Sequence, residues 1–216
     1  MRIYAVADIH GRRDRMRLIK ENTIKLKPDV LIVAGDITHF IDPVPTIARL
    51  NDMPVPVLAI RGNTDLKRVE HLIGKYPNIR PLHLKNIVIE NACFVGMSGT
   101  VPVPFSSRIS LREGPVIGKV MSLLKRDSIL VAHPPPWGTL DEVLGRFHAG
   151  CRSLGRIVSR IQPRLLICGH IHERPGTAFI GETLVINCAM GRTGAGAVID
   201  LNVDQDPKVE MLRCSS

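Results

Sequence analysis

Five short apolar runs, each followed at once by polar residues, constrain the fold of this 216-residue chain more than any other feature. The runs span residues 3–7, 30–34, 55–60, 128–132 and 165–168. Runs of this length are typical of buried strands. Residues 14–27 space Met16, Ile19 and Leu26 at helical intervals, so we expect a helix between the first two strands. This strand, helix, strand order favours a parallel sheet.

Five polar motifs follow the predicted strands. They are Asp8-Ile9-His10, Gly35-Asp36, Gly62-Asn63-Thr64-Asp65, His133 and Gly169-His170-Ile171-His172. Open α/β sheets bind ligands outside the carboxyl ends of their strands, so we expect these residues to converge at one edge. Within the first motif, the period of two in extended chain turns the Asp8 and His10 side chains the same way.

The chemistry of these side chains points to metal ions. Carboxylate, imidazole and amide oxygen ligands suit borderline and hard divalent cations. Two such ions held about 3.5 to 4 Å apart activate a water for attack on phosphorus. Each motif alone is a weak signal, but all five in this order rarely occur together by chance. Together they predict a paired-metal site.

The motifs resemble those of the calcineurin-like metallophosphoesterase superfamily, which read DxH, GD, GNH[D/E], H and GHxH. The resemblance covers this chain from about residue 3 to about residue 190. A closer likeness is to short prokaryotic phosphoesterases, through residues 135–139 (Pro-Pro-Trp-Gly-Thr), 148–150 (His-Ala-Gly) and 168–173 (Cys-Gly-His-Ile-His-Glu). The resemblance implies two sets of metal ligands and one bridging carboxylate. These are Asp8, His10 and His172 for one metal, Asn63, His133 and His170 for the other, and Asp36 between the two.

The resemblance also implies a metal-dependent phosphoric ester hydrolase, with a phosphodiesterase favoured over a monoesterase. In such an enzyme a metal-bound hydroxide attacks the phosphorus in line. Manganese is the expected metal, with iron, zinc, nickel and cobalt as alternatives, because Asp, His and Asn ligands suit them all. Two other functions stay open: a nuclease of the same fold, and a metal-binding scaffold without activity.

One position departs from the family pattern. Thr64 replaces the His that usually protonates the leaving oxygen or stabilises the transition state. A hydroxyl cannot replace it as a general acid, and such catalysis typically contributes a factor of about 10² to 10⁴. His148 and His39 are the candidates to replace the missing His. His148 lies in a Gly-flanked stretch that predicts a loop. Asn63 is a third candidate catalytic residue. The alternative interpretation is that both histidines are surface residues on loops.

The order of elements predicts a single domain over residues 1–216, an α/β fold of four layers, α/β/β/α, with two mixed sheets between helices. Further helices are expected over residues 45–50, 65–73, 115–125 and 153–161, with Asp65 as the N-cap of the second of these. Antiparallel strands are expected at 87–89 and 93–97, a long loop at 98–110, and β structure at 177–180, 183–187, 195–201 and 208–212. His71 and His83 have no motif around them.

The chain is basic, with a formal net charge of +9 and a pI of about 9.7. The charge is scattered and only 4% of residues are aromatic, so we expect no base-stacking surface, and nucleic acid is not the favoured partner. We expect a phosphorylated small molecule as substrate, near Arg12 and Arg13.

No apolar stretch is long enough for a membrane helix, and we expect a cytoplasmic protein with five reduced cysteines. The oligomeric state stays open.

Overall fold

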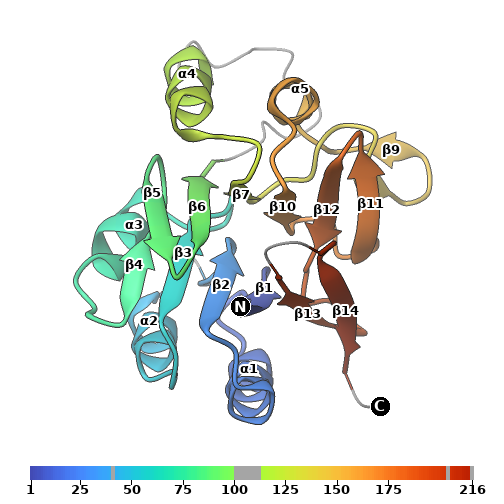
Figure 1. Cartoon of the computed structure of the whole chain (residues 1–216). Coiled ribbons are helices and arrows are strands. Elements are labelled where there is room, and N and C mark those ends of the chain that lie inside the picture. The colour runs from blue at the N-terminus through green and yellow to red at the C-terminus, as the bar shows by residue number, and fades with distance from the viewer. Residues whose placement is uncertain (40–41, 100–112, 203–204, 215–216) are drawn as a thin grey trace.

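A computed structural model describes residues 1–39, 42–99, 113–202 and 205–214. These residues form two six-stranded sheets that pack face to face (Figure 1). The first sheet has the order β14-β13-β1-β2-β3-β4. Its strands are β1 (Arg2–Val6), β2 (Val30–Ala34), β3 (Val57–Ile60), β4 (Ile79–Pro81), β13 (Gly194–Asp200) and β14 (Lys208–Arg213).

The second sheet has the order β11-β12-β10-β7-β6-β5. Its strands are β5 (Asn86–Ile89), β6 (Ala92–Met97), β7 (Ile129–Ala132), β10 (Leu165–Cys168), β11 (Gly176–Ile180) and β12 (Thr183–Asn187). A small hairpin of β8 (Glu142–Val143) and β9 (Phe147–His148) lies outside it. Both sheets are mixed: β1 to β4 run parallel while β13 is antiparallel to β1, and β5 and β11 are the antiparallel strands of the second sheet.

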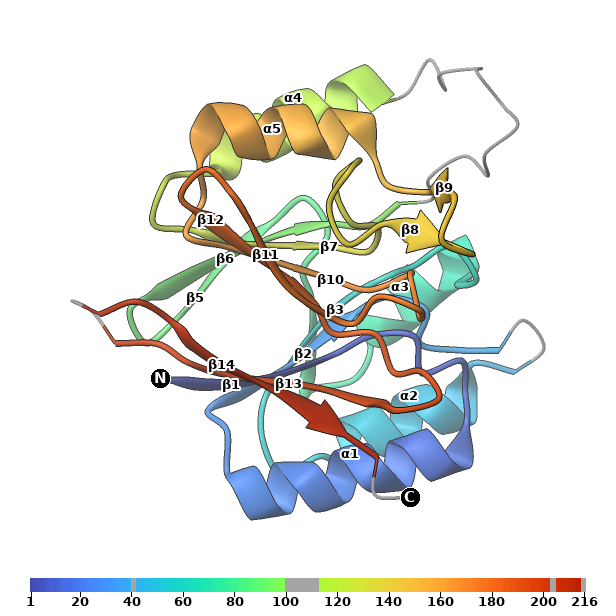
Figure 2. The same cartoon turned by 90° about the vertical axis from the view of Figure 1, so that its right-hand side faces the viewer.

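Helices cover the outer face of each sheet, which gives the four layers seen in Figure 2. The first sheet is covered by α1 (Arg13–Leu26), α2 (Val44–Asn51) and α3 (Lys67–Ile73), and the second by α4 (Glu113–Leu123) and α5 (Arg152–Ile161). The predicted α/β/β/α architecture is therefore confirmed. None of the described helices is long and apolar enough to cross a membrane.

Three apolar layers hold the sheets and helices together. The central layer lies between the sheets and includes Ile32, Leu58 and Phe94, all fully buried. A second layer joins the first sheet to α1, α2 and α3, and a third joins the second sheet to α4 and α5. Strands buried on both faces explain why the sequence shows continuous apolar runs instead of alternating ones.

The structure corrects the sequence analysis in several places. The helix predicted at 65–73 begins at Lys67 and its N-cap is Leu66, so the prediction of Asp65 as N-cap is wrong. The short strand β4 and the hairpin β8–β9 were not predicted, because strands of two or three residues leave almost no periodic pattern. The predicted loop at 98–110 lies outside the described residues from residue 100 on.

Candidate metal centre

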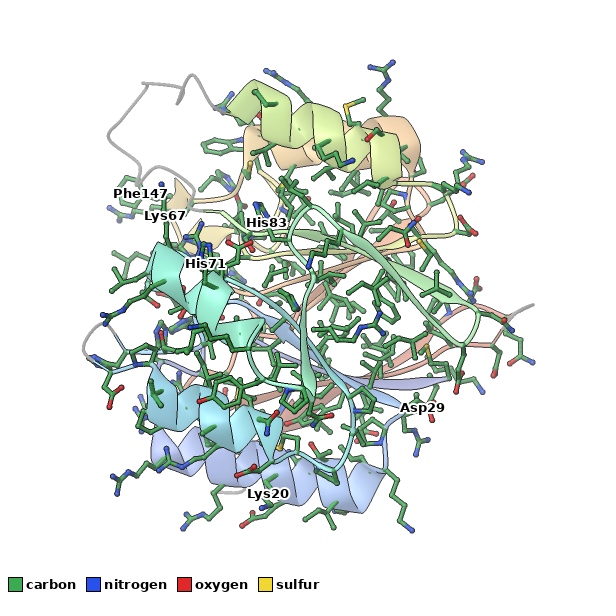
Figure 3. The ribbon with its side chains drawn as sticks, turned by 90° about the vertical axis from the view of Figure 1, so that its left-hand side faces the viewer. Lys20, Asp29, Lys67, His71, His83 and Phe147 are labelled. Atoms are coloured by element: carbon green, nitrogen blue, oxygen red, sulfur yellow. The ribbon has the colours of Figure 1, made fainter. Side chains whose placement is uncertain are left out.

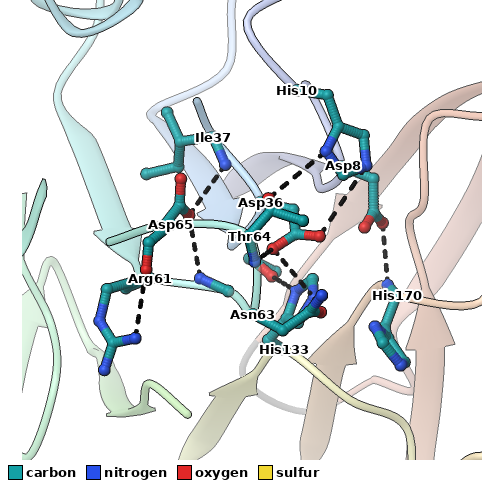
Figure 4. Close-up of polar contacts among 12 residues, drawn as sticks. Asp8, His10, Asp36, Ile37, Arg61, Asn63, Thr64, Asp65, His133 and His170 are labelled. Carbon is teal, nitrogen blue, oxygen red and sulfur yellow. Dashed lines mark hydrogen bonds and ion pairs between the residues drawn. The ribbon is translucent and has the colours of Figure 1, made fainter. Parts of the chain in front are cut away.

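The predicted motifs meet where the parallel strands of both sheets end, and Figure 4 shows most of their polar side chains gathered there. Within the second sheet, the N–H of Gly169 donates to the carbonyl of His133 at 2.9 Å. Between the sheets, the N–H of His170 donates to Oδ2 of Asp8 at 2.8 Å. The second of these contacts joins residues that are 162 positions apart in the chain.

Four of the predicted ligands have left-handed backbone conformations. The φ angles are 61° at Asp8, 52° at His10, 50° at Asp36 and 71° at His170. Asp and His tolerate this region better than most residues, but each instance still costs about 1 to 3 kcal/mol. Such a cluster, directly after the strands, indicates a site where the surrounding structure fixes the direction of each side chain.

Asp8, His10 and His172 form the first donor set, whose ligand atoms lie within 4.8 Å of one another. Oδ1 of Asp8 is buried and has no hydrogen-bond partner, although Nε2 of His172 lies 3.3 Å away. A buried carboxylate oxygen is costly unless a donor or a cation compensates it. The first donor set therefore fits a divalent cation.

Asp8, Asp36 and His133 form the second donor set, again within 4.8 Å. Oδ1 of Asp36 lies 3.4 Å from Nε2 of His133, and Oδ2 lies 3.8 Å from Nε2 of His10. The two oxygens of Asp36 therefore face different donor sets, as a carboxylate shared by two ions would. Asp8 contributes to both sets, whereas the resemblance assigned it to one metal.

His133, Asn63 and His170 also lie together. Nδ1 of His133 donates to the carbonyl of Ala34 at 2.8 Å, so its Nε2 faces Oδ1 of Asn63, also at 2.8 Å. A metal-binding His commonly has its other nitrogen fixed in this way. The His170 ring lies 5.1 Å from the His133 ring, centroid to centroid, but His170 belongs to neither of the two closely spaced sets.

The charges in the site are strongly coupled. Burial lowers the pKa of His133, but the hydrogen bond and charge of Asp36 outweigh it and raise that pKa to about 9. Burial raises the pKa of Asp36, but His133 and the N–H of Thr64 more than compensate and hold it below its usual range. Burial and the nearby His133 lower the pKa of His170 to about 4. In the metal-free protein, His133 therefore carries a proton that a cation must displace.

Glycines in the motifs allow the loops to approach each other. A Cβ at Gly169 would lie 2.6 Å from Oδ2 of Asp8 and would collide with Cβ of Ala7. A Cβ at Gly62 would collide with the Asp36 carboxylate. These glycines are therefore required by the packing of the loops against the ligands.

Asp65 supports the site from behind, a role that the sequence analysis missed. Its carboxylate is buried and accepts from the N–H groups of Ile37, Thr38 and Gly62 at 3.0, 2.9 and 3.0 Å. The Thr38 hydroxyl donates to it as well, at 2.8 Å. Asp65 thus connects the loop after Asp36 to the loop before Asn63. The position of Asp65 within the third motif was the sequence signal that could have indicated this role.

Asn187, at the end of β12, supports the last motif. It is fully buried, and its Nδ2 donates to the carbonyls of Ile171 and Arg174 at 2.9 and 3.0 Å. These two bonds fix the loop that carries His170 and His172.

His148 lies on β9, in a hairpin where we expected a loop. Its Nδ1 donates to Oδ1 of Asp141 at 2.7 Å. Asp141 is buried, and its Oδ2 accepts from the N–H groups of Gly138 and Gly150, both at 3.0 Å. The imidazole is therefore oriented by a fixed carboxylate, with Nε2 as the nitrogen left to meet a ligand.

Trp137 stands beside His148 and is 41% exposed. The Arg152 guanidinium lies 4.1 Å from the centre of its indole ring, and the His148 ring lies 5.3 Å away. We expected no stacking surface from the low aromatic content, but this one Trp provides a flat exposed ring.

Thr64 and His39 are the remaining predicted residues. Thr64 donates its N–H to Oδ1 of Asp36 at 2.8 Å, and its hydroxyl lies 3.5 Å from Nδ1 of His10. His39 is exposed, with its backbone against Gly11, and its catalytic role stays a prediction.

Two further histidines, His71 and His83, are labelled in Figure 3. His71 is exposed on α3, and His83 accepts a hydrogen bond from the N–H of Ser98 at 2.9 Å. Neither belongs to a donor set.

Fold and donor chemistry together are those of a metal-dependent phosphoester hydrolase. A family model for calcineurin-like phosphoesterases matches residues 1–174, and the chain belongs to this family. An uncharacterised protein of Methanocaldococcus jannaschii is 32% identical to the chain over 198 residues, and the match covers 87% of each protein.

Solved structures share the fold at low sequence identity. A dimetal phosphatase from Danio rerio has a TM-score of 0.66 at 12% identity, over 99% of this chain and 96% of that one. A novel archaeal phosphodiesterase has a TM-score of 0.59 at 14% identity, over 98% of this chain and 100% of that one.

Proposed function

We propose that the protein is a phosphodiesterase that uses two divalent metal ions, with Mn²⁺ as the first candidate. The observation that carries the proposal is the position of Asp36, whose oxygens lie 3.4 and 3.8 Å from histidines of two different donor sets. When bound, two such cations supply positive charge to the phosphoryl oxygens and lower the pKa of a water. The diesterase reaction draws further support from the archaeal phosphodiesterase of the same fold.

The residues of the chain hold and orient the reacting groups. The buried Asp8 and Asp36 carboxylates supply negative charge, and His10, His133, His170 and His172 supply neutral nitrogens. Asn63 turns Oδ1 toward His133, which leaves its Nδ2 free to donate to a phosphate oxygen. The amide therefore has both a ligand role and a substrate role in this proposal.

His148 is the proposed source of the proton that Thr64 cannot supply. Asp141 fixes the orientation of the imidazole by its hydrogen bond to Nδ1 at 2.7 Å. Nε2 is then the atom that protonates the leaving oxygen or contacts the phosphate. His39 is the second candidate for the same role.

A metal reconstitution experiment tests the function. The chelated protein is assayed with added Mn²⁺ on aryl monoesters, aryl diesters, cyclic nucleotides and single-stranded nucleic acid, and aryl diesters should be cleaved faster than monoesters. Asp36→Asn should reduce both metal content and turnover, whereas Asp127→Asn makes the same change at an exposed position and should not. Two tightly bound metals with normal activity in Asp36→Asn would contradict the proposal.

A leaving-group series tests His148. The His148→Ala variant should lose about 10² in kcat on diesters with poor leaving groups while its metals remain bound. His71→Ala removes an exposed imidazole from α3 and serves as the control. If no residue donates the proton, rates should instead depend steeply on leaving-group pKa, and Thr64→His should improve the poor substrates. Both accounts would be refuted if the rate depended only weakly on leaving-group pKa and the His148→Ala variant kept the wild-type kcat.

One observation favours the nuclease as a second candidate. The exposed Trp137 ring, stacked on Arg152, is the kind of surface on which a nucleobase stacks. Faster cleavage of single-stranded nucleic acid than of aryl diesters, lost in Trp137→Ala, would support the nuclease.

A further inference from the structure

A cavity of about 680 Å³ lies beside the candidate metal centre, between the first half of α1 and the turn before β13. Figure 2 shows α1 running below β13 and β14 on this side of the molecule. Charged side chains dominate its lining: Arg12, Arg15, Arg17 and Arg192, with Asp14 and Glu21. None of these arginines is needed for the ligand sets described above.

Two contacts connect the cavity to the first donor set. The Arg15 guanidinium donates to the backbone carbonyl of Asp8. Gly191, which also lines the cavity, packs so closely that a Cβ there would lie 3.1 Å from the carbonyl of His172. Residues that line the cavity therefore contact the backbone of Asp8 and of His172, both members of the first donor set.

The charges in the cavity are only partly compensated. Arg12 forms an ion pair with Asp14 at 2.8 Å, and Arg17 lies 3.9 Å from Glu21. Arg15 donates a hydrogen bond to the uncharged backbone carbonyl of Asp8. Arg192 makes no ion pair with any described residue. Four guanidinium groups thus face two carboxylates, and the two without carboxylate partners come from different segments of the chain.

A guanidinium group suits two-point recognition of a phosphate better than an ammonium group does. The guanidinium presents N–H donors in a planar fork that matches two phosphate oxygens. Two arginines that approach one cavity from different segments can contact a phosphate from two sides. An excess of positive charge next to a site for phosphate esters also raises the local concentration of polyanionic substrates.

We propose that this cavity binds a second phosphate group of the substrate, so that the substrate is a phosphodiester that carries a further phosphate. The inference rests on the proposed phosphodiesterase function. Arg15 and Arg192 are the phosphate contacts, while Arg12 and Arg17 are held by their carboxylate partners and add only to the field. The same chemistry would accept free inorganic phosphate, and the experiment separates the two sources.

A matched pair of substrates tests the inference on the metal-loaded enzyme. The thymidine dinucleotide TpT and its 5′-phosphorylated form pTpT contain the same scissile diester. Wild-type protein should cleave pTpT with a kcat/KM about tenfold or more above that of TpT, and Arg192→Ala should bring the ratio close to one. Arg156→Ala removes the same charge from an exposed position on α5 and should keep the wild-type ratio. Equal rates for the pair in wild type, or an unchanged ratio in Arg192→Ala, would overturn the inference.

A binding measurement separates this inference from the proposed function. Inorganic phosphate is titrated into the chelated protein, whose fold is checked by circular dichroism. Wild type and Arg156→Ala should bind phosphate alike, and Arg192→Ala should bind it about tenfold more weakly, with Arg192→Lys in between. If neither the dinucleotides nor the aryl diesters are cleaved but this binding pattern holds, the phosphodiesterase proposal fails and the phosphate site stands. Stimulation of TpT cleavage by free phosphate, without preference for pTpT, would overturn the assignment to the substrate.

Discussion

Asp65→Asn is the sharpest test of how the site is held in place. The Asp65 carboxylate accepts hydrogen bonds from three backbone N–H groups and one hydroxyl, which lie in two different loops. Asn keeps the shape but replaces one acceptor oxygen by an NH₂ donor. In its best orientation, the amide oxygen accepts from Ile37 and Gly62, and the NH₂ faces Thr38. The Thr38 hydroxyl can rotate to accept, but the Thr38 N–H loses its partner.

The cost follows from these contacts. A buried N–H without a partner costs about 1 to 3 kcal/mol, and the bonds that remain lose the strength that the charge gave them. We therefore expect the free energy of unfolding to fall by about 2 to 4 kcal/mol, a large part of the roughly 5 to 15 kcal/mol of a typical domain. Because Asp65 joins the loops of Asp36 and Asn63, metal affinity should fall too, by about tenfold or more.

Urea unfolding of the chelated protein measures the first effect, and calorimetric Mn²⁺ titration measures the second. The control is Asp127→Asn, the same change at an exposed position, which should alter neither. A loss below about 1 kcal/mol together with wild-type metal affinity would refute the argument, because unsatisfied buried N–H groups of this kind cost more.

Two further predictions concern the metal centre itself. Gly169→Ala should abolish tight metal binding, because its methyl group would lie 2.6 Å from Oδ2 of Asp8; Gly118→Ala, where the structure leaves open space on α4, is the control and should not reduce metal binding. Metal affinity should rise with pH between about 6 and 9, because the metal-free His133 has a pKa of about 9 and must lose its proton to bind a cation. Affinity that is flat over this range, measured in the same titration, would contradict the protonation of His133.

Much of the architecture could be predicted from the sequence because its signals are local. An apolar run such as residues 30–34 identifies a strand buried on both faces, and the helix after β1 makes the first strands parallel. The polar residues after those strands must then lie at one sheet edge, whatever the details of packing. The sequence by itself therefore determined the parallel strands of the first sheet and the proximity of Asp8 and Asp36, whereas His133 follows β7 of the second sheet and meets them through the packing of the two sheets.

The supporting contacts depend on packing between segments that are distant in the chain. Asp65 reads as a helix cap in its local sequence, and only the approach of the Asp36 loop makes it a buried acceptor. The pairing of His148 with Asp141 depends on a hairpin of two-residue strands, too short to leave a periodic pattern. The arginine cavity likewise needs the turn before β13, which carries Arg192, to lie beside α1. Sequence patterns report the environment along one segment, whereas the partner of a polar side chain is chosen by tertiary packing, and the tertiary structure alone decided these contacts.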